Sequence, residues 1–254
     1  MRVIRSLATA FSMYSRIPVP RVEWSDGNRR YAMCFFPLIG AVIGGALRLW
    51  LWLCEQLGCG SLLRGAFAAI LPVLITGGIH MDGFMDTMDA LGSCQPRERK
   101  LEILKDSRVG AFAAMALCAY LLLCAALYGE MPLKSAPALM PCFVLSRALS
   151  AGAAVTLRGA RADGMLQGFA KAAQSSIVLC TCFAYAAACL LGWVLFGGAR
   201  TAGLCLAAAL CVSLYYVRMA YKQFGGVTGD LAGWYLQVME LALIGAVYLG
   251  GKIG

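Results

Sequence analysis

Long runs of apolar residues alternate along the chain with short polar segments that are rich in Lys and Arg. Seven runs stand out, at about residues 33–53, 62–80, 111–129, 136–157, 176–196, 201–217 and 231–250. A helix needs about 20 apolar residues to cross the hydrocarbon core of a bilayer. Spanning segments are helical because unpaired backbone groups are costly in lipid. The pattern therefore predicts an all-α, polytopic integral membrane helical bundle with about seven transmembrane helices.

The composition supports a membrane environment. Apolar residues make up 61% of the 254 residues and charged residues 14%, whereas soluble domains contain roughly 45–50% and about 25%. A soluble fold could not hide this much apolar surface, so the lipid bilayer is the expected partner. Most of the 12 cysteines lie in apolar runs without a zinc-binding spacing, and we interpret them as packing residues. We expect one domain, residues 1–254.

The basic residues predict the orientation in the membrane. The net charge is +9. When the polar segments are assigned alternately to the two sides, sixteen Lys and Arg fall on the side of the N-terminus and four on the other. Basic segments stay in the cytoplasm, which places the N-terminus there and the C-terminus outside. This distribution explains the charge without a nucleic-acid partner. Residues 2–14 are mildly amphipathic, which is typical of a short interfacial helix.

Three acids follow the second apolar run and are the strongest sign of chemistry. Asp82, Asp86 and Asp89 have the spacing i, i+4, i+7, which places them on one face of a helix. Like charges repel there, at a cost that rises near lipid. A divalent cation would offset this repulsion, and Mg²⁺ prefers carboxylates together with water and phosphate oxygens. The alternative is a solvated acidic face.

The same loop continues with a basic segment, residues 97–110. Asp106 is a candidate for a further metal ligand or a general base. Lys105 and Arg108 are candidates for binding phosphate, since the guanidinium fork matches phosphate oxygens. The alternative for these basic residues is a role in topology alone.

Further candidates lie in other segments of the predicted cytoplasmic side. Residues 15–20 form a rigid basic segment that contains Arg16. Residues 158–169 are basic and contain glycines, and residues 224–230 form a glycine-rich turn. Consecutive backbone N–H groups in such a turn can bind an anion, although a plain tight turn is the simpler interpretation. The candidate binding residues in this turn are Gly225, Gly226, Thr228 and Asp230.

Two charges fall inside apolar runs. Arg147 and Glu240 are candidates for a functional site or for pairing with one another, because ionisable residues in a membrane are rarely incidental. His80, the single histidine, lies two residues before Asp82 and is either catalytic or an ordinary interfacial histidine. Gly40 and Gly44 have the spacing of a close helix–helix contact.

At these segments the chain resembles the cobalamin synthase (adenosylcobinamide-GDP ribazoletransferase) family. The resemblance covers nearly the whole chain and is carried in order by residues 15–20, 36–40, 77–89, 99–110 and 225–230. The acidic stretch together with residues 105–110 is the most specific part. The chain departs from the family pattern at Ala90, where a glycine is usual, and at Gly164–Leu166, where the family has GLG. Two acids are usual at the positions of Gln237 and Glu240, and here the first of them is a glutamine.

The resemblance implies a late step of vitamin B12 assembly in the bacterial inner membrane, with the active site facing the cytoplasm. The family joins adenosylcobinamide-GDP to α-ribazole or α-ribazole 5′-phosphate, releases GMP and requires Mg²⁺. In this chemistry Asp82, Asp86 and Asp89 would hold Mg²⁺ at the diphosphate. Arg108 and Lys105 would stabilise the leaving phosphate, and Asp106 is the first choice for the proton acceptor.

Three other functions are compatible with parts of the pattern. CDP-alcohol phosphotransferases also use membrane-embedded acids with Mg²⁺, but their usual motif differs at Asp86–Thr87. A transporter would suit the glycine-rich turn and the charges within apolar runs, yet the acids cluster at one membrane face. A purely structural subunit would leave the acidic face unexplained.

Overall fold

The computed structural model describes residues 2–20, 22–23, 25–161 and 164–253. Within these ranges the chain is helical and has no strand; residues 159 and 227 form an isolated bridge. The predicted all-α class is confirmed.

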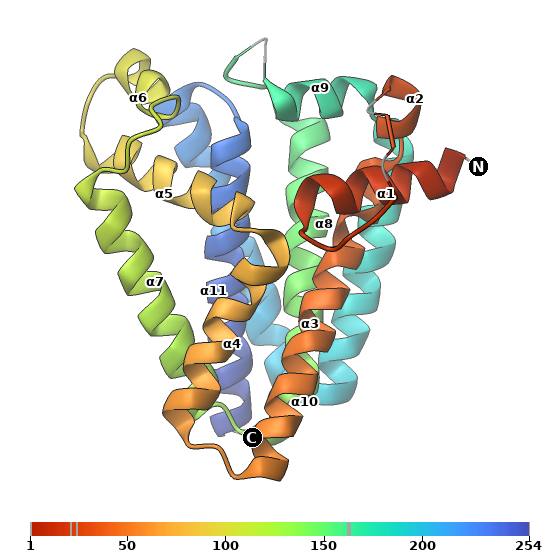
Figure 1. The fold of residues 1–254 in the computed structure, drawn as a ribbon, viewed down its shortest axis with the longest axis vertical. Coiled ribbons are helices and arrows are strands. Elements are labelled where there is room, and N and C mark those ends of the chain that lie inside the picture. Colours follow the sequence, from red (N-terminus) through yellow and green to blue (C-terminus); the bar gives the residue numbers. More distant parts are fainter. Residues whose placement is uncertain (1, 21, 24, 162–163, 254) are drawn as a thin grey trace.

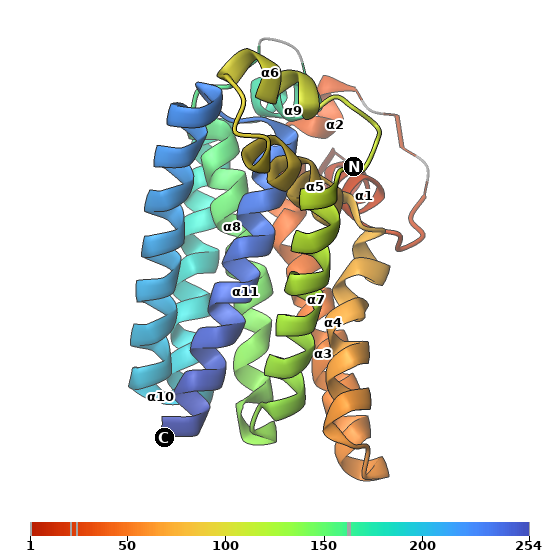
Figure 2. The same ribbon diagram turned by 90° about the vertical axis from the view of Figure 1, so that its left-hand side faces the viewer.

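The longer helices run side by side and form the bundle (Figures 1 and 2). In chain order they are α3 (Ala32–Leu57), α4 (Ser61–Thr76), α7 (Ala111–Glu130), the 3₁₀ turn η1 (Leu133–Leu139) leading into α8 (Met140–Thr156), α10 (Ser175–Met219) with the π-helical turn η2 (Ala220–Phe224), and α11 (Gly229–Ile253). Shorter helices gather at one end of the bundle (Figure 1): α1 (Arg2–Tyr14), α2 (Asp26–Arg29), α5 (Ile79–Gly92), α6 (Arg97–Ile103) and α9 (Met165–Ala172).

The bundle has the helices of a multi-pass membrane protein. In the described part of the chain, five helical segments are long and apolar enough to cross a membrane, or six if the bent pair α4 and α5 counts as one crossing. Large apolar side chains point outward from α7 and α10, among them Leu122, Phe183, Leu195 and Leu214, which are all more than half exposed. Lipid is the natural cover for such a surface. The count of seven stays a prediction.

The segment from Ser175 to Phe224 forms two antiparallel arms. Gly198 interrupts it with φ 77° and ψ 169°, and the two arms lie side by side in Figure 2. Directly before the first arm, the backbone amide of Gln174 donates to the carbonyl of Arg30. At the start of the second arm, the Arg200 guanidinium donates to the carbonyl of Ile253 at the end of α11. The two apolar runs predicted at 176–196 and 201–217 therefore occupy separate arms.

The second apolar run ends earlier than its composition predicts. The run was expected to continue to residue 80, but α4 ends at Thr76 and the chain turns by 101° into α5. Gly77 (φ 67°) and Gly78 (φ 81°) have left-handed backbone conformations that favour glycine. Arg16 covers this bend: its amide donates to the carbonyl of Ile75 at 2.8 Å, and its side chain fills the space that a Cβ on Gly77 would need.

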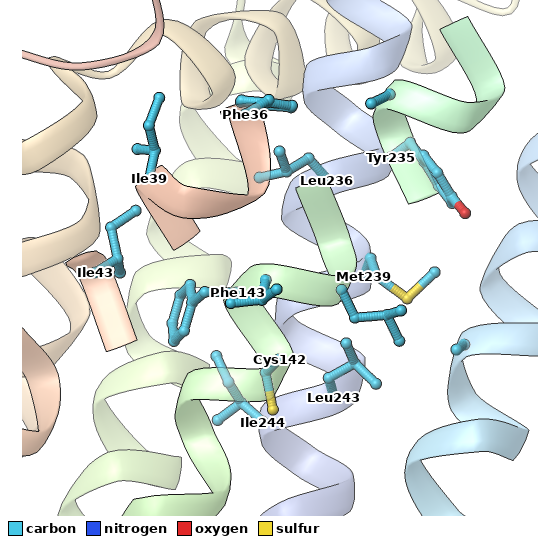
Figure 3. Close-up of a cluster of buried hydrophobic side chains, with 14 of the residues drawn as sticks. Phe36, Ile39, Ile43, Cys142, Phe143, Tyr235, Leu236, Met239, Leu243 and Ile244 are labelled. Carbon is cyan, nitrogen blue, oxygen red and sulfur yellow. The ribbon is translucent and has the colours of Figure 1, made fainter. Parts of the chain in front are cut away.

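The core lies where α3, α8 and α11 meet, and Figure 3 shows apolar side chains from these helices in contact. Gly40 and Gly44 let α3 approach so closely that a Cβ at either position would overlap Phe143 or Met140 of α8. Their predicted packing role is confirmed.

A buried ion pair crosses the same core. Nη1 of Arg147 in α8 lies 2.6 Å from Oε1 of Glu240 in α11, and both side chains are almost fully buried. Ser146 adds a hydrogen bond to the same carboxylate oxygen. The two charges that the sequence places inside apolar runs therefore pair with one another. Such a pair is costly to bury but far more costly to break.

The residues predicted to share one membrane face lie at one end of the bundle. Helices α1, α2, α5, α6 and α9 all lie there, whereas α11 ends at the opposite end of the bundle (Figure 1). Helix α1 forms as predicted, with Ser6 and Thr9 buried and Val3 and Ile4 exposed. Its location at a membrane interface stays a prediction.

Candidate active site

Helix α5, which carries the acidic stretch, crosses the start of α11 at the end of the bundle (Figure 1). Two glycines allow the close crossing. A Cβ on Gly83 would lie 2.8 Å from the Cα of Asp230, and a Cβ on Gly233 would lie 2.8 Å from the carbonyl oxygen of His80. The two helices therefore touch backbone to backbone. This contact brings Asp230 of α11 to the acidic helix α5.

Asp82 and Asp230 lie close enough to Asp86 for their charges to act on it, and we call these three carboxylates the acidic group. The pKa of Asp86 is raised from 3.8 to about 7, first by partial burial and then by the negative charges of Asp82, Asp230 and Asp89. A carboxylate is disfavoured in this way when other carboxylates crowd it without a counter-charge. A bound cation would relieve this repulsion, so the acidic group is the favoured position for one.

Asp89 has a second role that its spacing does not reveal. Its Oδ2 accepts the Gly110 amide at 2.6 Å and its Oδ1 accepts the Ala113 amide at 2.8 Å. These amides lie at the start of α7, so Asp89 caps that helix from a distant part of the chain. Both carboxylate oxygens already have partners, which makes Asp89 a weaker candidate for a metal ligand than Asp82 or Asp86.

Asp106 and Arg108 bind each other in the loop between α6 and α7. Nε and Nη2 of Arg108 donate to the two carboxylate oxygens of Asp106 at 2.9 and 2.7 Å. These hydrogen bonds lower the pKa of Asp106 to about 2, so the carboxylate is a poor proton acceptor at neutral pH. The arrangement disfavours the predicted role as general base. The Lys105 and Arg108 side chains are exposed, which leaves both accessible to a phosphate.

His80 is buried, unlike an ordinary interfacial histidine. It packs against the rings of Tyr14 and Phe36, with centroid distances of 5.9 and 5.4 Å. Burial, and then the charge of Arg147, lower the pKa of His80 to about 3, so the imidazole is neutral. Its Nε2 is buried without a hydrogen-bond partner among the described residues.

The glycine-rich turn is a structural junction. The amides of Gly225, Gly226 and Val227 donate to the carbonyls of Tyr221, Ala220 and Arg158. The Arg97 guanidinium covers Gly225, and the Thr228 hydroxyl accepts the Leu231 amide at 3.2 Å as the first turn of α11 begins. The predicted anion nest is not supported, because these three amides already have partners. The turn instead ties residues 158–160 to the start of α11.

Two cavities meet at Asp230. The first, of about 250 Å³, is mainly apolar and is bordered by α1, α3, α5, α8, α9 and α11. The second, of about 240 Å³, is more polar and is lined by Arg161, Gln167 and Thr228. Gly229, Asp230, Met165 and Leu166 line both. Asp82 borders the first cavity, so two of the three carboxylates of the acidic group, Asp82 and Asp230, face these cavities.

Comparison with known proteins identifies the family. The sequence profile of the cobalamin-5-phosphate synthase family matches residues 6–248. The chain belongs to this family. A protein from Lachnoclostridium phytofermentans named adenosylcobinamide-GDP ribazoletransferase is 44% identical over 95% of this chain and 92% of its own length. Proteins with the same name from Desulfitobacterium hafniense and Ralstonia nicotianae are 36% and 35% identical, over 97% and 94% of this chain and 98% and 93% of theirs. No solved structure matches the chain significantly.

Membership of the cobalamin-5-phosphate synthase family makes the chain a transferase of cobalamin biosynthesis. The resemblance stated from the sequence is thereby confirmed. The match also favours this family over the CDP-alcohol phosphotransferase, transporter and structural-subunit alternatives, because it runs through nearly all of the chain.

Sequence reasoning placed Asp230 in an anion-binding turn and did not connect it with Asp82 and Asp86. Its only local signal is a position directly after a glycine-rich turn. Gln167 and Arg161, which line the polar cavity, were also not singled out as site residues. Their segment is basic and contains glycines, but nothing in its spacing indicates that it faces the start of α11.

Proposed function

We propose that this chain joins adenosylcobinamide-GDP to α-ribazole or its 5′-phosphate in a Mg²⁺-dependent reaction at the cytoplasmic face of the bacterial inner membrane. The observation that carries the proposal is the convergence of Asp82, Asp86 and Asp230 between α5 and α11. The family match supplies the reaction class, and this convergence supplies a place where it can occur.

The donors of the acidic group fit Mg²⁺ in their chemistry. Mg²⁺ is usually held by one or two carboxylates, waters and substrate phosphate oxygens. Asp82 and Asp86 would be the protein ligands, with Asp230 close to them. Among the described residues, no group of three His, Cys, Asp or Glu side chains is placed to hold a metal ion, so waters and the substrate diphosphate would supply the remaining oxygens. Bound there, Mg²⁺ would neutralise negative charge on the diphosphate.

The reaction breaks a phosphoanhydride linkage and forms a phosphoester linkage. A ribose hydroxyl of α-ribazole attacks the phosphorus attached to cobinamide, a new P–O bond forms, and the bond to the GMP oxygen breaks. Phosphoryl-type transfer depends mainly on positioning and on charge neutralisation. Asp82 and Asp230 border the apolar cavity, and one of them would accept the hydroxyl proton in place of Asp106. Arg161 in the polar cavity, with Arg108 and Lys105, would stabilise the leaving phosphate.

The orientation rests on charge. The helices and loops around the acidic group contain the basic segments that the positive-inside rule assigns to the cytoplasm. Adenosylcobinamide-GDP carries a charged diphosphate and cannot cross a bilayer unaided, so an active site on this face meets it directly.

Purified protein in lipid or detergent, given adenosylcobinamide-GDP, α-ribazole and Mg²⁺, should release cobalamin and GMP in equal amounts. Asp86→Asn should reduce this turnover by at least a hundredfold, the range that mutagenesis gives for loss of a charge-stabilising group. Asp26→Asn is the matched control, because Asp26 is an exposed acid at the same end with only a loose ion pair to Arg29. Full turnover by Asp86→Asn would contradict the role of the acidic group, and conversion of CDP-alcohols alone would contradict the reaction.

A further inference from the structure

The apolar cavity beside the acidic group has the chemistry of a binding site for a flat aromatic base. We propose that this cavity binds the benzimidazole base of the ribazole substrate and so orients its ribose toward the acidic group. The inference rests on the proposed function, since it assigns one of the two substrates to a defined part of the same site.

The cavity walls favour an aromatic ligand. Tyr14 of α1 and Phe36 of α3 contribute rings, with centroids 4.3 Å apart, and Met33 and Met165 contribute thioethers. Aromatic faces and methionine sulfur both contact ring systems favourably. Pockets for small molecules are typically apolar with a few placed polar groups, and this cavity matches that description.

The size of the cavity indicates which of the two substrates can bind in it. A volume of about 250 Å³ accommodates a bicyclic base with part of its ribose. The corrin macrocycle with its side chains is several times larger and has to lie outside. The ribazole is therefore the substrate that the cavity can enclose.

His80 supplies a polar contact that fits this base. It lines the cavity, and its Nε2 is buried without a hydrogen-bond partner among the described residues. A buried polar atom without a partner is costly. The benzimidazole of a ribazole has one ring nitrogen bonded to ribose and one free ring nitrogen that accepts a hydrogen bond. With a proton on Nε2, His80 can donate a hydrogen bond to that free nitrogen.

The polar side of the cavity indicates how the ribazole would lie. Asp82 and Asp230 border the apolar cavity, and Asp230 also lines the polar cavity that contains Arg161. With the base held among the aromatic rings and methionines, the ribose would extend toward the two carboxylates. The diphosphate of the other substrate would approach from the side of Arg161. The attacking hydroxyl and the phosphorus would then meet at the acidic group.

The test measures which base the protein prefers. The kcat/KM values are compared for the ribosides of 5,6-dimethylbenzimidazole and of naphthimidazole, which has one more fused ring. Met33→Ala removes most of a buried side chain from the cavity wall and should raise the naphthimidazole-to-dimethylbenzimidazole ratio by on the order of tenfold. The KM for adenosylcobinamide-GDP should stay unchanged. Met131→Ala is the matched control, because Met131 is similarly buried but directly follows α7, a helix that does not line the cavity.

Met13→Ala gives a second enlargement in case Met33→Ala does not fold. Met13 also lines the cavity but belongs to α1 at the outside of the bundle, and it is only partly buried. A ratio that stays the same in the folded, active variants would overturn the assignment of the cavity. If the unsubstituted protein converts neither riboside, the proposed function itself is wrong, which is a different failure from a wrong assignment of the cavity.

His80→Ala tests the hydrogen bond separately. The unsubstituted protein should have a higher kcat/KM for the benzimidazole riboside than for an indole riboside, which lacks the free ring nitrogen. In His80→Ala the ratio of these two kcat/KM values should fall at least tenfold. A merely structural His80 would lower kcat/KM for both ribosides equally. That outcome would show that His80 does not bind the base.

Discussion

Gly83 of α5 lies against the backbone of Asp230 in α11, with space for a hydrogen atom but not for a methyl group. A Cβ at position 83 would lie 2.8 Å from both the Cα and the carbonyl oxygen of Asp230. These neighbours are backbone atoms and cannot rotate away. The distance between the carboxylates of the two helices therefore depends on this glycine.

Gly83→Ala should separate α5 from α11 and lower turnover by about a hundredfold, the cost typical of a displacement near 1 Å in an active site. The measurement is GMP release under saturating substrates. Gly245→Ala in α11 is the control, because a Cβ there meets nothing within 4 Å, and it should keep full activity. Full activity of Gly83→Ala would mean that the helix crossing does not set the geometry of the acidic group.

Asp89 can be assigned to capping or to metal binding by two substitutions. Asp89→Ala removes the acceptor for the Gly110 and Ala113 amides and should cost about 1 kcal/mol of stability. Asp89→Asn keeps one carbonyl oxygen at the same reach but removes the charge. If Asp89 is mainly a cap, Asp89→Asn should lose less stability than Asp89→Ala and keep its turnover. A large loss of Mg²⁺-dependent turnover in a stable Asp89→Asn variant would instead assign the residue to the metal.

The sequence predicts the parts of this molecule that depend on local pattern. The apolar runs predict most of the bundle, and the i, i+4, i+7 spacing predicts that Asp82 and Asp86 share a face. The role of Asp89 as a cap depends on a contact with a helix about twenty residues later in the chain, and spacing within α5 cannot show it.

Contacts between segments far apart in the sequence explain the other differences. Asp230 joins the acidic group only because Gly83 and Gly233 let two helices cross. The amides of the glycine-rich turn are occupied because residues 158–160 lie beside it. The bend at Gly77 and Gly78 depends on left-handed backbone angles, which a hydropathy pattern does not record.

The buried pair of Arg147 and Glu240 should be a strong determinant of stability. Glu240→Gln leaves a buried guanidinium without its counter-charge, and loss of one partner of such a pair typically costs about 3–5 kcal/mol. Thermal unfolding in a fixed detergent measures the loss. The double variant Arg147→Met with Glu240→Leu should recover much of the stability, since neither charge remains buried.

The exposed pair of Arg99 and Glu102 provides the control for this experiment. Its charged atoms lie 2.6 Å apart, but both side chains are 64% exposed, and surface pairs contribute little. Glu102→Gln should leave the unfolding temperature almost unchanged. Equal effects of Glu240→Gln and Glu102→Gln would show that burial does not govern the contribution of the core pair.

The raised pKa of Asp86 predicts a pH dependence of Mg²⁺ binding. Because the folded-state pKa is about 7 rather than 3.8, Asp86 is protonated below about pH 7 in the metal-free protein, and Mg²⁺ has to displace that proton. Apparent Mg²⁺ affinity, measured from the Mg²⁺ dependence of turnover, should rise between pH 5.5 and pH 7 by about tenfold per pH unit, then level off.

The same shift predicts that the stability of the metal-free protein falls as pH rises from about 4 to 7, since ionisation of Asp86 is disfavoured in the folded state. Asp86→Asn should remove this dependence of stability on pH, and Asp26→Asn should retain it. A Mg²⁺ affinity that is independent of pH in the unsubstituted protein would exclude Asp86 as the titrating ligand.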